Sequence, residues 1–164
     1  MRTFTLLIAT LIAGGIAMSG CGDNIESVSA AECASTRKWV GDDSGDPGMH
    51  PGRDCIGCHN SGGDGPSFYA AGTVYGADKQ ADDCLGVAGA VIEITDKNGV
   101  VHRMSSNDSG NFYTKDAITP PYTAKVIVGT KERVMGTPQT TGACNSCHTQ
   151  AGANGAPGRI LLPQ

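Results

Sequence analysis

Two pentapeptides in this chain combine thiols and an imidazole at a spacing that suits a covalently bound cofactor. They are Cys55-Ile56-Gly57-Cys58-His59 and Cys144-Asn145-Ser146-Cys147-His148. In Cys-x-x-Cys-His, the two thiols bond to the vinyl groups of a haem and the adjacent imidazole binds its iron. The pattern occurs twice among seven cysteines and four histidines, which predicts two haem c groups per chain. The residues expected to hold them are Cys55, Cys58, Cys144 and Cys147 as covalent attachment points, with His59 and His148 as proximal iron ligands.

The ligand on the far side of each iron is left open by the sequence. A methionine there raises the reduction potential of a haem relative to a second histidine. Met49 and Met135 precede the two motifs at comparable positions, so we expect them to be the distal ligands. The alternatives are His50, His102 and Met104. For His102 and Met104, which share one face of a predicted strand, a surface histidine and a core methionine are the favoured interpretation.

The N-terminal residues predict export. Arg2 is followed by an almost uninterrupted apolar run over residues 4–17 and by small residues at 19 and 20. This arrangement is typical of a secretory signal peptide, here residues 1–20. The apolar run is shorter than the roughly 20 residues that a membrane-spanning helix needs.

Met18-Ser19-Gly20-Cys21 resembles a bacterial lipobox, with Met18 where leucine is usual. The resemblance implies that Cys21 is acylated and becomes the first residue of the mature protein, which tethers it to a membrane. Gly22 stands where an aspartate would favour retention in the inner membrane. We therefore expect a lipoprotein of the bacterial cell envelope, on the periplasmic side or the surface of the outer membrane. An ordinary cleaved signal is the alternative.

The remaining cysteines, Cys33 and Cys84, predict a disulfide in an oxidising compartment. A closed loop of about 50 residues stabilises a fold by about 4 kcal/mol in the chain-entropy model. Two Cys-x-x-Cys pairs also suit a tetrahedral zinc site or thiol redox chemistry. Export, and the histidine that follows each pair, favour haem over both.

Composition limits the partners and the core. The chain has 12 basic and 16 acidic residues, and removal of Arg2 with the signal peptide makes the mature protein more acidic still. Such a surface argues against nucleic acid and favours basic protein partners. Only 39% of residues are hydrophobic and 5% aromatic, so we expect haem to supply part of the apolar core and folding to be coupled to haem attachment.

Short β-rich runs separated by turn residues occupy the middle of the chain and predict an all-β sandwich. The runs are 68–75, 90–95, 100–105, 111–114 and 122–128. Asn98-Gly99 favours a tight hairpin between two of them. The expected organisation is a signal peptide (1–20), a lipid-anchored segment (21–48), a haem-binding segment (49–66), the sandwich (67–130) and a second haem-binding segment (131–164), the two haem segments forming one compact unit.

Several stretches resemble the carboxypeptidase-regulatory-like, prealbumin-type β-sandwich. They are Ala-Gly-Thr-Val-Tyr at 71–75, the run at 86–96, Gly-Asn-Phe-Tyr at 110–113 and Pro-Pro-Tyr-Thr-Ala-Lys-Val at 120–126. The resemblance implies a small Greek-key scaffold without catalytic residues, flanked here by irregular or short-helical haem segments. With its two motifs, the chain also resembles small haem-binding lipoproteins of bacterial envelopes.

These patterns together predict a membrane-tethered di-haem cytochrome that transfers electrons to redox proteins of the cell envelope and transforms no substrate. A structural or adhesion module stabilised by haem is the main alternative. A haem peroxidase or reductase is less favoured, because few histidines remain for a distal pocket.

Overall fold

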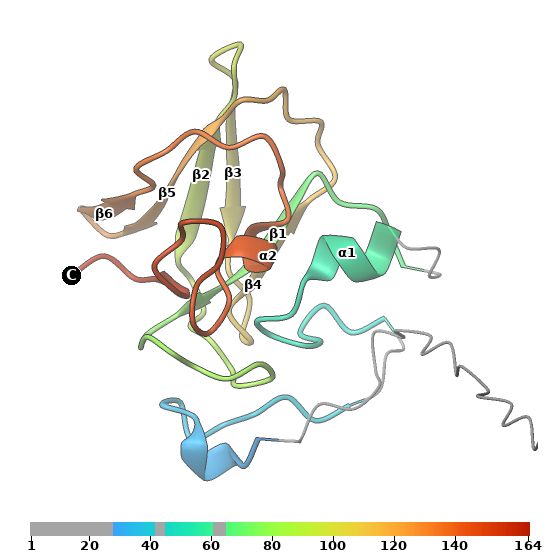
Figure 1. Cartoon of the computed structure of the whole chain (residues 1–164), viewed down its shortest axis with the longest axis vertical. Helices are drawn as coiled ribbons and strands as arrows, with labels where there is room; N and C mark the ends of the chain where they lie inside the picture. The colour runs from blue at the N-terminus through green and yellow to red at the C-terminus, as the bar shows by residue number, and fades with distance from the viewer. Residues whose placement is uncertain (1–27, 42–44, 61–64) are drawn as a thin grey trace, which may run out of the picture.

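The computed structural model describes residues 28–41, 45–60 and 65–164. Within them the fold is mostly β, with two sheets and few helices (Figure 1). The strands are β1 (Ala70–Tyr75), β2 (Val91–Thr95), β3 (Val101–Ser105), β4 (Asn111–Thr114), β5 (Thr123–Val128), β6 (Lys131–Val134) and β7 (Ile160–Leu161). The helices are α1 (Cys55–Asn60), α2 (Cys144–Cys147) and a 3₁₀ turn at Ala30–Glu32. The expected all-β class is confirmed at this level.

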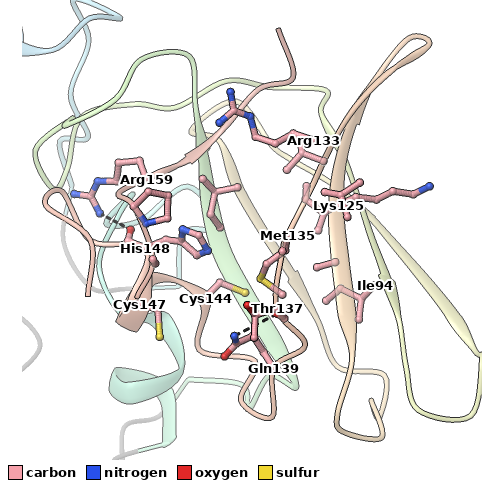
Figure 2. Close-up of a pocket in the computed structure, with 18 of the residues that line it drawn as sticks. Ile94, Lys125, Arg133, Met135, Thr137, Gln139, Cys144, Cys147, His148 and Arg159 are labelled. Atoms are coloured by element: carbon pink, nitrogen blue, oxygen red, sulfur yellow. Dashed lines mark hydrogen bonds between the residues drawn. The ribbon is translucent and has the colours of Figure 1, made fainter. Parts of the chain in front are cut away.

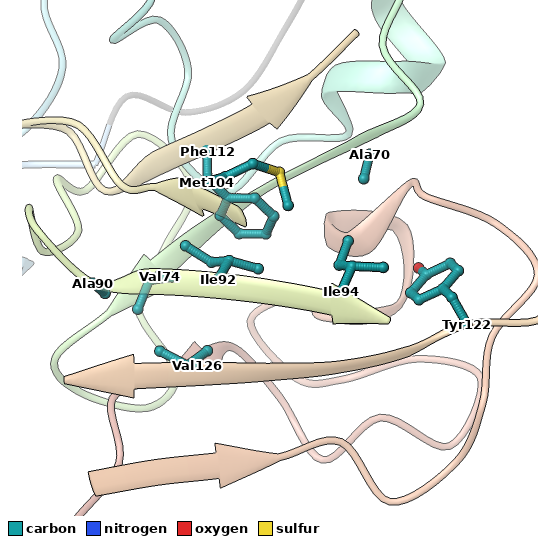
Figure 3. Close-up of a cluster of buried hydrophobic side chains, with 9 residues drawn as sticks. All are labelled: Ala70, Val74, Ala90, Ile92, Ile94, Met104, Phe112, Tyr122 and Val126. Atoms are coloured by element: carbon teal, nitrogen blue, oxygen red, sulfur yellow. The ribbon is translucent and has the colours of Figure 1, made fainter. Parts of the chain in front are cut away.

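The two sheets enclose one apolar core. One sheet has the strand order β4-β1-β7 and the other β3-β2-β5-β6. In β2, Ile92 and Ile94 are buried in this core, whereas Glu93 on the opposite face pairs with Arg103 and Lys125. This alternation is the reason the segment forms a strand with one apolar face. The core side chains come from both sheets (Figure 3): Ala70, Val74, Ala90, Ile92, Ile94, Met104, Phe112, Tyr122 and Val126.

The strands extend further along the chain than the sequence predicts. The five runs expected to be strands are present as β1 to β5, with ends that differ by at most two residues. Strands β6 and β7 lie beyond the 67–130 range expected for the sandwich. Strand β6 has no apolar alternation, since it reads Lys-Glu-Arg-Val, and it pairs because Gly129, with φ +58°, turns the chain back on β5. Strand β7 has two residues, too few for a pattern.

Strand β1 is buried on both faces, and helices α1 and α2 and strand β7 all pack against it. Ala70 and Val74 contribute to the core between the sheets. Thr73 and Tyr75 alternate with them and face the other way, where segments 49–53 and 142–162 cover the sheet. All six residues of β1 are therefore buried, although only one side of the strand belongs to the sandwich core.

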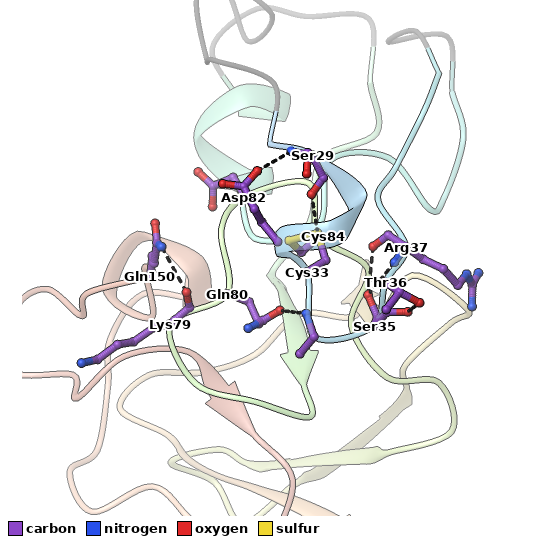
Figure 4. Close-up of a disulfide and its surroundings, with 12 residues drawn as sticks. Ser29, Cys33, Ser35, Thr36, Arg37, Lys79, Gln80, Asp82, Cys84 and Gln150 are labelled. Carbon is purple, nitrogen blue, oxygen red and sulfur yellow. Dashed lines mark hydrogen bonds between the residues drawn. A yellow bond between two sulfur atoms is a disulfide. The ribbon is translucent and has the colours of Figure 1, made fainter.

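A disulfide fastens the N-terminal segment to the middle of the chain. Cys33 and Cys84 are bonded, the pairing expected from the cysteine count (Figure 4). Both side chains are buried with Tyr75, apart from the main core. Two hydrogen bonds add to this junction: the Ala34 N–H donates to Gln80 Oε1 at 2.7 Å, and the Trp39 N–H donates to the Asp83 carbonyl at 2.7 Å. None of the helices in the described part of the chain has the length and apolar character to span a bilayer.

Candidate functional site

The first Cys-x-x-Cys-His motif forms helix α1. Asp54 precedes it and its Oδ1 accepts the Gly57 N–H at 3.0 Å, which satisfies a backbone donor at the helix start. In a helix, residues at i, i+3 and i+4 share one face. The local fold therefore places Cys55, Cys58 and His59 on one side, as attachment to a single flat ligand requires.

The second motif forms helix α2, and His148 follows directly. The His148 N–H donates to the Cys144 carbonyl at 2.9 Å, so the spacing of thiols and imidazole repeats that of α1. Gly72 lets this helix approach β1. A Cβ at Gly72 would lie 2.9 Å from the Cβ of Cys144 and 2.8 Å from the Phe112 ring, so a larger residue there would push α2 away from the strand.

The protonation of the His148 ring is fixed by a backbone carbonyl. His148 Nδ1 lies 2.8 Å from the Gly158 carbonyl oxygen. A carbonyl oxygen only accepts, so Nδ1 carries the proton and Nε2 keeps its lone pair. A metal-binding histidine needs this arrangement, in which the second nitrogen donates to a fixed acceptor.

The His59 ring is held differently. Its Nδ1 is buried without a hydrogen-bond partner among the described residues. The ring lies against Phe68, with centroids 4.8 Å apart, and Phe68 lies in turn 4.7 Å from the Tyr113 ring. Apolar contacts therefore orient the imidazole of the first motif, whereas a hydrogen bond orients that of the second.

A cavity of about 430 Å³ opens beside the second motif, within the range of cofactor and ligand sites. One wall is the inner face of the β2-β5-β6 sheet, and the other is α2 with the C-terminal segment (Figure 2). Its apolar lining includes the core residues Ile92, Ile94, Phe112, Tyr122 and Val126, together with Ala124, Ile160 and Leu161. Cys144, Cys147, His148 and Met135 line the same cavity.

The candidate distal ligands fall into two groups. Met135 lines the cavity with His148 and packs against the core. Met49 does not line it; this residue lies before α1, where its carbonyl accepts the Asn111 Nδ2 group at 2.8 Å. His50 Nδ1 lies 3.0 Å from Asp83 Oδ1, and its ring packs on Trp39.

The two candidates in β3 lie away from this cavity. Met104 belongs to the core between the sheets, as the interpretation of a core methionine expects. His102 is not a surface residue: its side chain is 9% exposed and its Nε2 lies 3.7 Å from Asp96 Oδ2. The alternation of side chains does not indicate this pairing, because it depends on Asp96 in the turn that precedes β3.

The two motifs are brought together by a buried polar network on the outer face of β1. Asn145, the first variable residue of the second motif, is 3% exposed. Its Nδ2 group donates to the Arg53 carbonyl at 2.9 Å and to Thr73 Oγ1 at 3.1 Å, and its Oδ1 accepts the Thr73 N–H at 3.1 Å. Arg53 lies two residues before Cys55, so one side chain joins β1 to the segments of both Cys-x-x-Cys-His motifs.

Thr73 completes the network. Its hydroxyl donates to Asn111 Oδ1 at 2.7 Å and accepts the Gly52 N–H at 2.9 Å as well as the Asn145 amide. The donor and both lone pairs of the hydroxyl are therefore used. A network satisfied in this way fixes one arrangement of its members, here the segment before α1, strands β1 and β4, and helix α2.

Arg159 also links the segment before α1 to the segment that follows α2, and its side chain is 1% exposed. Its guanidinium donates to the carbonyls of Gly52 and His148, at 3.0 and 3.3 Å, and pairs with Asp82 at 2.5 Å. It also lies over the Tyr75 ring, 5.2 Å from the centroid. Sequence reasoning missed Arg159, Asn145 and Thr73, because most of their partners lie more than 20 residues away in the chain.

The thiols of the two motifs differ in state. Cys55, Cys144 and Cys147 are free thiols, whereas Cys58 is disulfide-bonded. Burial raises the pKa of the Cys55 thiol to about 11 and that of Cys144 to about 12, and the proximity of Cys55 contributes to the shift at Cys144. Both thiols are therefore protonated at neutral pH and poorly nucleophilic.

Two expectations concern residues outside those described: the signal peptide over 1–20 and the acylation of Cys21. Across residues 28–41, 45–60 and 65–164, no three side chains of His, Cys, Asp or Glu gather as a metal-ion site would require. Comparison with protein families, curated proteins and solved structures found no match for this chain.

Proposed function

We propose that this protein is an exported, membrane-tethered di-haem c-type cytochrome that transfers electrons in the bacterial cell envelope. One observation carries the proposal: the two Cys-x-x-Cys-His helices lie against one strand, tied by Asn145, and the second faces an apolar cavity lined by its own thiols, its histidine and a methionine. A haem in such a site supplies reversible one-electron chemistry at iron.

The second motif fits a haem in its donors and its surroundings. Nε2 of His148 keeps the lone pair that an iron ligand needs, because Nδ1 donates to Gly158. The lining of the cavity is largely apolar, which suits the faces of a porphyrin and excludes water from the iron. Met135 lines the same cavity and is the distal ligand that we assign to this haem.

The first motif fits in its helix geometry and requires one change. The disulfide of Cys58 has to be reduced, with two electrons and two protons from a thiol reductant of the cell envelope, before the Cys58 thiol can add to a vinyl group. His59 Nδ1, which has no hydrogen-bond partner among the described residues, then needs an acceptor, because a metal-binding histidine is oriented by a hydrogen bond from its other ring nitrogen. Met49, with His50 as the alternative, remains the distal ligand we propose here; use of His50 would break its contact with Asp83.

The chain contributes position and burial to this function. Asn145 and Arg159 fix α2 and the segment before α1 on the same face of β1, so two haems attached there would lie near each other. Electron transfer between centres is favoured by such short, rigid spacing. The acidic surface of the chain favours docking to basic redox proteins, an encounter that salt weakens.

The proposal also covers the type of β-sandwich, the lipid anchor and the role of the sandwich. The two sheets are arranged as in the Greek-key, prealbumin-type sandwich, and Cys21 carries the lipid that holds the protein at the outer membrane. The sandwich is a scaffold, and the protein is not an enzyme. What supports the scaffold interpretation is that Asn145 joins the segments of both motifs to the outer face of β1, through Thr73 and the Arg53 carbonyl.

A second function, a structural or adhesion module stabilised by haem, is favoured by the cavity lining. Core residues Ile92, Ile94 and Phe112 line both the core and the cavity, so a bound porphyrin would complete the core between the sheets. This function predicts haem without reversible redox cycling in the range of physiological partners.

Expression of the full chain with a c-type cytochrome maturation system tests both functions. Mass spectrometry and haem quantitation are expected to give two covalent haems per chain, with low-spin, six-coordinate spectra that cycle reversibly in a redox titration. Met135→Leu is expected to change the ligation of one haem, and Met49→Leu that of the other. Haem-free protein with bound zinc, or with intact Cys58 disulfide and one haem, would overturn the di-haem proposal.

A further inference from the structure

Arg133 projects from the inner face of an edge strand, where an apolar side chain is expected. It is paired with Val126 in the antiparallel register of β5 and β6, and residues paired in this way have side chains on the same face of the sheet. Val126 is 5% exposed and belongs to the core. Arg133 is itself exposed at the end of the sheet and lines the cavity beside the second motif.

Arg133 is the cationic residue of this cavity that has no ionic partner. Lys125 pairs with Glu93 at 3.3 Å and with Glu132 at 2.9 Å, and Arg159 pairs with Asp82. Within the described residues, no carboxylate lies within ion-pair distance of the Arg133 guanidinium. Figure 2 shows that group on the same side of the strand pair as His148 and Arg159, while the Lys125 ammonium points away.

Met135 continues the same face two residues further along. Its N–H donates to the Ala124 carbonyl at 2.9 Å, which extends the β5–β6 pairing past the end of β6. Side chains at i and i+2 in a strand are about 7 Å apart. A ligand that contacts Met135 inside the cavity therefore reaches Arg133 at its mouth, provided that it carries an anionic group several ångströms from its centre.

We propose that Arg133 is a positioning residue that binds a propionate carboxylate of the second haem at the mouth of the cavity. This inference rests on the proposed function, since it takes the occupant to be a haem attached through Cys144 and Cys147. A planar guanidinium binds a carboxylate through two parallel hydrogen bonds. The pair would add a third point of attachment for the haem, besides the bonds to Cys144 and Cys147, and would stabilise one orientation of it in the cavity.

The electrostatic consequences are measurable. The positive charge of Arg133 stabilises the ionised propionate and disfavours the more positive, oxidised iron, so it lowers the propionate pKa and raises the reduction potential of that haem. Removal of the charge is expected to reverse both effects. A carboxylate beside an arginine has its pKa lowered by about 1–3 units, and the loss of Arg133 should raise the propionate pKa by at least about one unit.

The test uses the haem-loaded full chain with Arg133→Gln, and Lys131→Gln as the control. Lys131 is on the same strand and carries the same charge, but it does not line the cavity. The measurement is the pH dependence of the midpoint potential of each haem. We expect Arg133→Gln to lower the potential of the haem bound by His148 and to move its pH-dependent step upward, with little effect from Lys131→Gln. Arg133→Lys should restore part of the shift.

Equal effects of Arg133→Gln and Lys131→Gln would overturn the inference. Arg133 would then be an inward-pointing charge that keeps the edge strand from pairing with another chain, and gel filtration would show association of the Arg133→Gln variant. Absence of covalent haem in the wild-type protein would instead refute the proposed function. Haem quantitation on each variant separates the two failures.

Discussion

Substitution of Asn145 tests whether one buried network holds both motifs against β1, because this side chain contacts β1 and the segments of both motifs. Truncation by Asn145→Ala removes three buried hydrogen bonds, two to Thr73 and one to the Arg53 carbonyl. Each contributes about 1 kcal/mol net, and a buried group that loses its partner costs about 1–3 kcal/mol. The Thr73 N–H and the Arg53 carbonyl lose this partner together. We therefore expect the free energy of unfolding to fall by about 3–5 kcal/mol.

The neighbouring residue supplies a control in the same motif. Ser146→Ala removes one partly buried hydrogen bond, from Ser146 Oγ to the Ala143 carbonyl at 2.6 Å, and should cost about 1 kcal/mol. Denaturant unfolding of the mature protein, followed by far-UV circular dichroism, measures both variants. If the free energy of unfolding falls by the same small amount in Asn145→Ala and Ser146→Ala, below about 1.5 kcal/mol, the network does not hold the two segments together.

Three further predictions concern the disulfide, one carboxylate and the thiols. Replacing both Cys33 and Cys84 by alanine opens a loop with a sequence separation of 51 and should destabilise the fold by about 4 kcal/mol, measured by denaturant unfolding; a loss below about 1 kcal/mol would contradict this. The Asp96 carboxylate is partly desolvated, yet hydrogen bonds from the N–H groups of residues 98, 100 and 119 leave its pKa below the usual value. Its contribution to stability should therefore be complete above about pH 4 and decline as the pH falls further, so the stability difference between wild type and Asp96→Asn should shrink in acid. In haem-free folded protein at pH 8, iodoacetamide should modify Cys55 roughly a hundredfold and Cys144 roughly a thousandfold more slowly than in denaturant, because burial raises their pKa to about 11 and about 12; equal rates in folded and denatured protein by mass spectrometry would show that the thiols are accessible.

The parts of the fold that local patterns determine could be predicted from the sequence. The alternation around Ile92 and Ile94 and the turn at Asn98-Gly99 correctly indicated strands β2 and β3. Strand β6 could not be predicted from local patterns, because three of its four residues are charged and, within the described part of the chain, its backbone is paired only with the neighbouring strand β5.

In the candidate site too, local features could be predicted and contacts between distant residues could not. The spacing of thiols and imidazole is local, and the structure places both sets on short helices. The contacts that join them are not local: Asn145 and Arg53 are 92 residues apart, and Arg159 and Gly52 are 107 apart. A threonine in a strand or an asparagine between two cysteines carries no sign of such a partner. The cavity depends likewise on the packing of segments that meet only in the folded chain.

The burial of Cys144 has a consequence for the order of events in the cell. This thiol packs against the core beside Tyr122, and its pKa is raised to about 12, so an attachment enzyme would find it protonated and only partly exposed in the finished fold. Strand β7, which lines the same cavity, lies near the end of the chain and docks on β1. Under the proposed function, the covalent bonds have to form in the interval between export and the docking of β7 on β1. Maturation is then a competition between two rates, and a variant that folds faster without its cofactor would be the less completely loaded protein.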